Sequence, residues 1–128
     1  MSIRRRIKYW LPTLAWAVLI FSFSSQPTFS TSQVHWQDFI IKKSAHLFVY
    51  AVLSVLIFRS LKLTTHYSRS YLLLFTLALT ISYAVTDEFH QTFTPGREPH
   101  LRDIVIDVIG AGIGLITLQK FDKIKKCP

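Results

Sequence analysis

The fold of this 128-residue chain is decided by the stretch Asp87–Asp107, which reads D-E-F-H-Q-T-F-T-P-G-R-E-P-H-L-R-D-I-V-I-D. Its 21 residues include nine ionisable side chains, counting histidines, and it lies between two strongly apolar segments. Ionisable groups next to hydrocarbon are costly, so they usually pair, face a cavity or have a functional role. The sequence therefore predicts a membrane protein with a polar site close to one membrane face.

The apolar residues of the chain come in blocks. Half of all residues are hydrophobic, and the mean hydropathy is +0.32. The blocks are roughly 15–20 residues long, about the length that an α-helix needs to cross the hydrocarbon core of a bilayer. They should be helical because the bilayer interior offers no water to backbone groups. We expect an all-α fold with a single domain over residues 1–128, formed by four transmembrane helices at about residues 9–24, 43–58, 71–86 and 103–118.

The basic residues are distributed unevenly, and the formal net charge is +8. In a four-span arrangement, eleven of them fall on one side of the membrane: Arg4, Arg5, Arg6, Lys8, Arg59, Lys62, Arg69, Lys120, Lys123, Lys125 and Lys126. The other side has Lys42, Lys43, Arg97 and Arg102. This asymmetry predicts cytoplasmic termini and an outward-facing Asp87–Asp107 stretch. The same distribution does not favour nucleic acid as a partner, and the single cysteine, Cys127, excludes an internal disulfide.

The first apolar block allows two interpretations. It is nearly long enough to remain in the chain as a span. The alternative is a cleaved signal peptide, with a basic start, an apolar core and small residues at Ser22, Ser24 and Ser25. The bulky Phe21 and Phe23 next to the candidate cleavage site favour a retained span. In both cases the segment that follows is exported.

That exported segment, from Gln26 to about Ile41, is expected to be a polar loop. Ser30, Thr31 or Ser32 could cap a short helix that lies in the membrane interface. This helix would carry Trp36, Phe39 and Ile40. The segment is too short for a separate external domain.

Polar residues mark the outward end of the second span. Lys43, His46 and Tyr50 are spaced i, i+3, i+7, so they share one helical face. Lys43 can extend to the interface, while His46 lies about one turn deeper. A lone histidine on an apolar helix is usually structural, but the lysine and tyrosine on the same face favour a role in a site.

Polar residues also mark the outward ends of the third and fourth spans. Asp87 and Gln91 share a helical face, Glu88 follows Asp87, and Thr94-Pro95-Gly96 is a turn signal before Arg97. In the fourth span the spacing is i, i+4, i+7, i+11 for Asp103, Asp107, Gly110 and Gly114. From the helical rise, Asp107 should lie about 6 Å deeper than Asp103. The two glycines form a G-x-x-x-G surface that permits close packing with another helix.

Four motifs in this order resemble the VanZ-like family. They are K-S-A-H-L-F-V-Y (43–50), D-E-F-H-Q (87–91), F-T-P-G-R (93–97) and D-I-V-I-D-V-I-G (103–110). The family pattern is K-x-x-H-x-x-x-Y, D-E-x-x-Q, P-x-R and D-x-x-x-N-x-x-G. Each motif alone is weak, but all four lie at predicted outward helix ends. The resemblance covers about Lys43 to Gly114.

The resemblance implies a small bacterial membrane protein located in the cytoplasmic membrane. The family takes its name from a protein associated with resistance to the lipoglycopeptide teicoplanin, which is a phenotype rather than a reaction. One position departs from the pattern: the family often has Asn where this chain has Asp107. A carboxylate there introduces a negative charge at the deepest polar position and removes an amide donor.

The predicted site is consistent with two functions at the outer leaflet. An enzyme acting on a lipid head group or lipid-linked envelope precursor could use acid, base or cation-ligand groups from His46, Asp87, Glu88, Asp103 and Asp107. Substrate would be held or oriented by Lys43, Tyr50, Gln91 and Arg97. A divalent cation is a candidate cofactor. A non-catalytic protein could instead use Lys43, Arg97 and Arg102 to bind an anionic lipid or an amphiphilic antibiotic, with the carboxylates fixing their geometry through ion pairs.

A third interpretation gives these residues no ligand. The same charged groups could form a polar network that fixes the order of the helices, and a buried ion pair alone indicates no more than that. Four short spans without a broken helix do not favour a transporter. The sequence alone leaves the choice between catalysis, binding and helix packing open.

Overall fold

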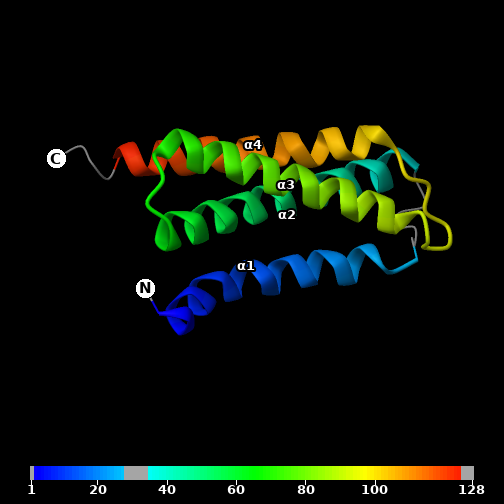
Figure 1. The fold of residues 1–128 in the computed structure, drawn as a ribbon. Helices are drawn as coiled ribbons and strands as arrows, with labels where there is room; N and C mark the ends of the chain where they lie inside the picture. The colour runs from blue at the N-terminus through cyan, green and yellow to red at the C-terminus, as the bar shows by residue number, and fades with distance from the viewer. Residues whose placement is uncertain (1, 28–34, 125–128) are drawn as a thin grey trace.

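The computed structural model describes residues 2–27 and 35–124, which form four helices and the segments between them. The helices are α1 (Ile3–Ser24), α2 (His35–Thr64), α3 (Arg69–Gln91) and α4 (Leu101–Ile124) (Figure 1). α1, α2 and α3 are long and apolar enough to cross a membrane, and α4 has a similar length. The prediction of an all-α bundle is confirmed.

The helices run up and down the bundle, so that both described ends of the chain lie at the same end (Figure 1). We call this the terminal end. The opposite end contains the last turn of α1, the first turns of α2, and the segment that joins α3 to α4. We call it the site end because the Asp87–Asp107 stretch lies there. The orientation of the two ends relative to the membrane remains a prediction from the basic residues.

The helices extend beyond the predicted spans. The expected polar loop up to Ile41 is wrong from His35 onward, because Trp36, Phe39 and Ile40 belong to the first turns of α2 rather than to a separate helix. The sequence from residue 35 to 64 contains no Pro or Gly that would interrupt a helix, and Asp38 pairs with Lys42 one turn later at 2.6 Å. α4 likewise continues past Gln119 to Ile124. The predicted caps at residues 30–32 and Cys127 lie outside the described residues.

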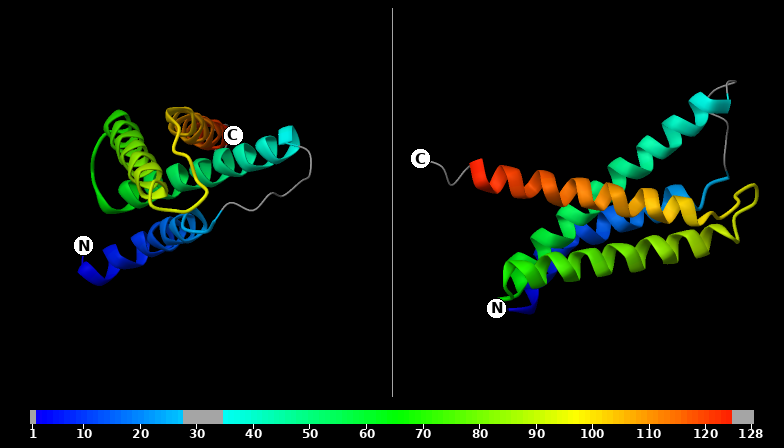
Figure 2. Two further views of the ribbon diagram at one scale, coloured as in Figure 1. Left: turned by 90° about the vertical axis from the view of Figure 1, so that its right-hand side faces the viewer. Right: turned by 90° about the horizontal axis from the view of Figure 1, so that it is seen from above.

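α2 has a different direction from the other helices. Seen from above, it crosses the bundle diagonally, and its first turns project beyond α4 (Figure 2). Its 30 residues correspond to about 45 Å of helix, which exceeds the hydrocarbon thickness of a bilayer. α2 must therefore be strongly tilted in the membrane, or one of its ends must lie outside the hydrocarbon.

Small residues allow α2 and α4 to approach closely. A Cβ added to Gly110 would lie 2.5 Å from the carbonyl oxygen of Leu47, and one added to Gly114 would collide with the backbone of Ala51. Ser54 also donates to the carbonyl of Ala111 at 3.0 Å. The G-x-x-x-G prediction of a packing surface agrees with this geometry.

α1 is held to the bundle by hydrogen bonds spread along its length. Thr13 contacts Ser60 at 2.8 Å between the hydroxyl oxygens. The Trp16 indole donates to a carbonyl of α2 at 2.9 Å, and the Tyr83 hydroxyl of α3 donates to a carbonyl of α1 at 2.6 Å. These contacts attach α1 to both α2 and α3 along its length.

Candidate functional site

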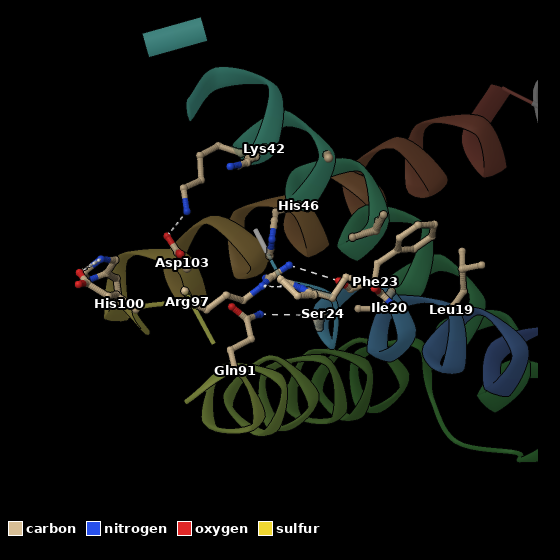
Figure 3. A pocket seen from close by; sticks show the side chains of 17 residues that line it. Leu19, Ile20, Phe23, Ser24, Lys42, His46, Gln91, Arg97, His100 and Asp103 are labelled. Atoms are coloured by element: carbon tan, nitrogen blue, oxygen red, sulfur yellow. Dashed lines mark hydrogen bonds and ion pairs between the residues drawn. The ribbon is translucent and has the colours of Figure 1, made fainter. Parts of the chain in front are cut away.

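A cleft of about 980 Å³ opens at the site end. Its walls come from the end of α1, the first half of α2, the segment before α4 and the first turn of α4 (Figure 3). The deeper part is lined by the apolar side chains of Leu19, Ile20 and Val49, and Phe23 and Ala45 lie nearer the end of the bundle. The outer part is lined by charged and polar groups: Lys42, Lys43, His46, Gln91, Arg97, Glu98, His100 and Asp103. The cleft therefore changes from apolar to polar towards the end of the bundle.

An ion pair and a histidine–carboxylate hydrogen bond join α2 to α4 along one edge of the cleft. Lys43 pairs with Asp103, and both side chains are less than one-fifth exposed. One turn deeper, Nδ1 of His46 lies 3.0 Å from Oδ1 of Asp107, whose side chain is 2% exposed. The predicted one-face spacing on each helix places the two pairs in register, because α2 and α4 run in the same direction. We call this contact, with the glycine contacts below it, the α2–α4 seam.

A second polar group lies between α1, α2 and α3. Oδ2 of the buried Asp87 accepts from the Ser24 hydroxyl at 2.8 Å, from the Gln91 amide at 3.2 Å and from the Tyr50 hydroxyl at 3.3 Å. Three helices thus meet at a single carboxylate oxygen. We call Ser24, Tyr50, Asp87 and Gln91 the Asp87 cluster. His46 and Tyr50 are neighbours on α2, with stacked rings 6.4 Å apart, and so connect the cluster to the seam.

The other oxygen of Asp87, Oδ1, is buried and has no hydrogen-bond partner within the described part of the chain. Buried carboxylate oxygens normally accept hydrogen bonds, because an unmade bond leaves the cost of desolvation uncompensated. Ser24 and Gln91, which bond to the same carboxylate, line the cleft. The unpartnered oxygen therefore lies directly behind the cleft wall.

Glu88 and Arg97 hold backbone at the site end. Oε1 of the buried Glu88 accepts from the backbone N–H of His100 at 2.7 Å, which ties the start of α4 to the end of α3. Arg97 donates to the carbonyls of Phe23 and Gln26 at 3.3 and 3.2 Å, at the last turn of α1. Free carbonyls at a helix C-terminus attract cations, so this contact stabilises the end of α1.

The predicted site residues divide into two groups. Lys43, His46, Gln91, Arg97 and Asp103 line the cleft. Tyr50, Asp87, Glu88 and Asp107 are buried behind its wall and contact the lining or its backbone. All nine thus gather at the site end, although no direct contact joins Glu88 or Arg97 to the other predicted side chains.

The sequence interpretation missed some participants. Ser24 entered it only as a small residue near a candidate cleavage site, yet it is buried and donates to Asp87. Lys42 and His100 line the cleft and were assigned no role. The sequence feature that could have pointed to Ser24 is its position as a polar residue at the site end of an apolar block. Neither Lys42 nor His100 had a distinguishing pattern.

A preformed metal centre is not found in residues 2–27 and 35–124. No group of three or more His, Cys, Asp or Glu side chains there is arranged to hold an ion. The carboxylates that were candidates for such a role are instead engaged with neighbours on other helices, as in the pairs of Asp103 and Asp107. The proposals below involve no metal ion.

Membrane-length helices, paired charges and a cleft at one end define a small multi-pass membrane protein with a polar site. A sequence model described as VanZ/LLP1 matches residues 9–121, and the chain therefore belongs to this family. The match extends from α1 to α4 and includes every residue of the α2–α4 seam and the Asp87 cluster. It confirms the family suggested by the four motifs. No curated protein and no solved structure matches the chain.

Proposed function

We propose that this protein binds an amphiphile, such as a membrane lipid or a lipid-linked envelope precursor, in the cleft at the site end. The observation that carries the proposal is the change in lining along the cleft. Lys42, Lys43 and Arg97 lie at its outer part, where a phosphate or another anionic group would be placed. Leu19 and Val49 lie deeper, where an apolar chain would be placed.

The direction of this change suits a ligand that enters from a bilayer. Val49 follows Lys43 by six residues, or about 9 Å along the helix axis. The apolar lining is thus about two turns closer to the middle of the bundle than the charged lining. A lipid has the same order, with its head group at the membrane face and its chains towards the midplane.

Binding can be tested with the purified protein in a neutral detergent. Native mass spectrometry would compare a phospholipid with a diacylglycerol that has the same acyl chains and no phosphate. We expect a saturable phospholipid adduct and weaker diacylglycerol binding. Equal binding of both lipids, or no binding of either, would contradict the proposal.

A blocking substitution locates the binding. Ala45 lines the cleft, and Ala45→Trp should fill it and reduce phospholipid binding. Ala78 is exposed on α3 and does not line the cleft, so Ala78→Trp is the matched control. Equal phospholipid binding by the two variants would place the lipid elsewhere on the protein.

A catalytic function is the second candidate, and the His46–Asp107 pair supports it. A carboxylate bonded to one ring nitrogen fixes the orientation of a histidine, so that the other nitrogen can exchange a proton with a ligand. His46 lines the cleft, while Asp107 lies behind it. Incubation with phospholipids and polyprenyl lipids, followed by mass spectrometry of products, tests this candidate. Product formation that is lost in His46→Gln would show that the protein is an enzyme. Saturable binding without product would show that it only binds the lipid.

The polar residues also join helices, which is what the helix-packing interpretation requires. Lys43–Asp103 and His46–Asp107 link α2 to α4, and Ser24–Asp87 links α1 to α3. Near-isosteric changes separate this role from ligand binding better than alanine does, because they keep the shape of the side chain. Lys42→Gln should weaken lipid binding without loss of folded protein; unchanged lipid affinity would favour a packing role alone.

The outward orientation of the cleft is part of the proposal. A cysteine introduced as Glu98→Cys, with Cys127→Ser, should react with a membrane-impermeant thiol reagent in intact cells. Reaction only after permeabilisation would place the site on the cytoplasmic side.

A link to teicoplanin-type resistance is proposed only as a consequence of amphiphile binding at the outer leaflet. Expression of the chain should then lower teicoplanin susceptibility, and Ala45→Trp should remove the effect. An equal effect of wild-type and Ala45→Trp proteins would separate resistance from the cleft.

A further inference from the structure

We infer that the head group bound in the cleft carries a primary ammonium group beside its phosphate. The ligand would then be zwitterionic rather than purely anionic. This inference rests on the proposed function, because it concerns the same cleft. It follows from the balance of charges at the site end and from the way in which the cations there are already engaged.

The site end is acidic, although the chain as a whole is basic. Four of the fifteen Lys and Arg residues lie at this end, together with six of the seven Asp and Glu residues: Asp38, Asp87, Glu88, Glu98, Asp103 and Asp107. This end has two more Asp and Glu than Lys and Arg residues, and the cleft lining itself mixes three basic side chains (Lys42, Lys43 and Arg97) with two carboxylates (Glu98 and Asp103). A site for a purely anionic head group would be expected to have a larger excess of positive charge and no accessible carboxylate, because like charges in a partly dehydrated cleft repel.

The cations that line the cleft are already engaged by protein groups. Lys42 lies 2.6 Å from Asp38, and Lys43 pairs with Asp103. Arg97 donates through Nε to the carbonyl of Gln26, just after α1, and through Nη2 to the carbonyl of Phe23 in its last turn. A phosphate could share these cations, but it would bring further negative charge close to their carboxylate partners. A ligand that also carries a positive group avoids this cost.

Two carboxylates are positioned to receive that positive group. Glu98 and Asp103 both line the cleft, and Glu98 follows Arg97 directly. The Glu98 side chain is 89% exposed, and its ion-pair contact with His100 is long, at 3.9 Å. Its carboxylate is therefore accessible to a ligand. The outer part of the cleft thus places the accessible Glu98 carboxylate, and the Asp103 carboxylate that pairs with Lys43, beside cationic donors, which matches an ammonium group next to a phosphodiester.

Asp87 provides an independent observation. Its Oδ1 is buried behind the cleft wall and lacks a donor in the part of the chain that the structure describes, although Asp87 is only 3% exposed. The buried side of the cleft therefore has a surplus acceptor rather than a surplus donor. Oδ1 is not open to the cleft, but its uncompensated negative charge behind the wall favours a positive group in the cleft over a further anion.

The test compares three phospholipids with identical acyl chains in the native mass spectrometry assay. Phosphatidylethanolamine has a primary ammonium, phosphatidylcholine has a positive charge without N–H donors, and phosphatidylglycerol is anionic. We expect phosphatidylethanolamine to bind about tenfold more tightly than phosphatidylglycerol, the difference expected for one charge-assisted hydrogen bond. The Glu98→Gln/Asp103→Asn variant should lose this preference. Asp122→Asn, which removes a carboxylate at the terminal end, should keep it.

The outcomes separate this inference from the proposed function. Equal or tighter binding of phosphatidylglycerol would overturn the inference while leaving amphiphile binding in place. Binding of phosphatidylcholine as tight as that of phosphatidylethanolamine would exclude recognition of N–H donors. A preference that survives in Glu98→Gln/Asp103→Asn would likewise overturn the assignment. If no phospholipid binds better than diacylglycerol, the proposed function itself fails.

Discussion

The α2–α4 seam and the Asp87 cluster join helices by different means. In the seam, two carboxylates each face one basic partner, and glycines below them bring the two backbones together. In the cluster, one carboxylate oxygen accepts from three neutral donors on three helices. The seam depends on charge and close fit between two helices. The cluster depends on several hydrogen bonds to one carboxylate oxygen. When one donor is removed, the remaining donors still bond to that oxygen.

This difference indicates how the cleft is built. α2 and α4 form the edge that is harder to open, because their separation would break a buried charged pair and a tightly packed backbone contact. α1 forms its other edge and is attached through single hydrogen bonds, such as those of Thr13 and Ser24, rather than through an ion pair. Substitutions in the seam should therefore cost more stability than substitutions in the cluster. The predictions below follow that order.

The largest effect is expected from His46→Ala. It leaves the buried Asp107 carboxylate without its hydrogen-bonding partner on α2. Removing one partner of a buried pair is strongly destabilising, so we expect a loss of about 3 kcal/mol in the free energy of unfolding. Denaturation of the purified protein by SDS, followed by circular dichroism, measures this change.

A double variant identifies the cause. His46→Ala/Asp107→Leu removes both charged groups and should regain much of the lost stability. If the double variant is as unstable as His46→Ala, packing of the imidazole rather than the ion pair maintains the seam.

Gly110→Ala should produce the next largest loss. The added methyl would lie 2.5 Å from the carbonyl oxygen of Leu47, so the two helices must separate. We expect a cost of about 2 kcal/mol, which is typical of overpacking. Gly112→Ala is the matched control, because no heavy atom lies within 4 Å of its added Cβ. It should leave stability unchanged or raise it slightly, since alanine favours a helix. Equal effects of the two substitutions in thermal melts would show that α2 and α4 are not in contact at Gly110.

The two regions also differ in how far the sequence predicts them. The seam could be anticipated, because helical periodicity places Asp103, Asp107, Gly110 and Gly114 on one face and His46 with Lys43 on another. The sequence does not show which helix packs against each of these faces, because periodicity describes only one helix at a time. It follows only when two separate helices are brought into register.

The Asp87 cluster was predicted in part. Gln91 is one turn from Asp87 on the same helix, so their proximity follows from the sequence. Ser24 comes from 63 residues away, and its contact depends on where α1 ends against α3. The start of α2 was also placed too late, because the length of a helix beyond the apolar block depends on side-chain pairs such as Asp38–Lys42 rather than on hydropathy.

Ser24→Ala should have a smaller effect than either seam variant. It removes one of three donors to Oδ2 of Asp87 and leaves the other two in place. We expect a loss of about 1.5 kcal/mol, the low end for a hydrogen bond to a carboxylate, because two other donors remain. Ser22→Ala is the control, because the exposed Ser22 hydroxyl donates only within its own helix, to the carbonyl of Val18. A cost for Ser24→Ala as large as that for His46→Ala in the same assay would remove the distinction between the two regions.

The smallest effect is expected from a charge pair outside both regions. Asp122 lies near the end of α4, with Lys62 at 3.8 Å and Arg69 at 3.7 Å, and both basic side chains are largely exposed. Exposed ion pairs contribute little because water and salt screen them, so Asp122→Asn should change the free energy of unfolding by less than about 0.5 kcal/mol. Added salt should reduce even this difference. A loss comparable to that of His46→Ala would mean that the stability of the seam comes from any charge pair between helices. A negligible loss would show that the stability of the seam comes from the burial of Asp107. That burial is the feature that distinguishes the seam from the terminal end.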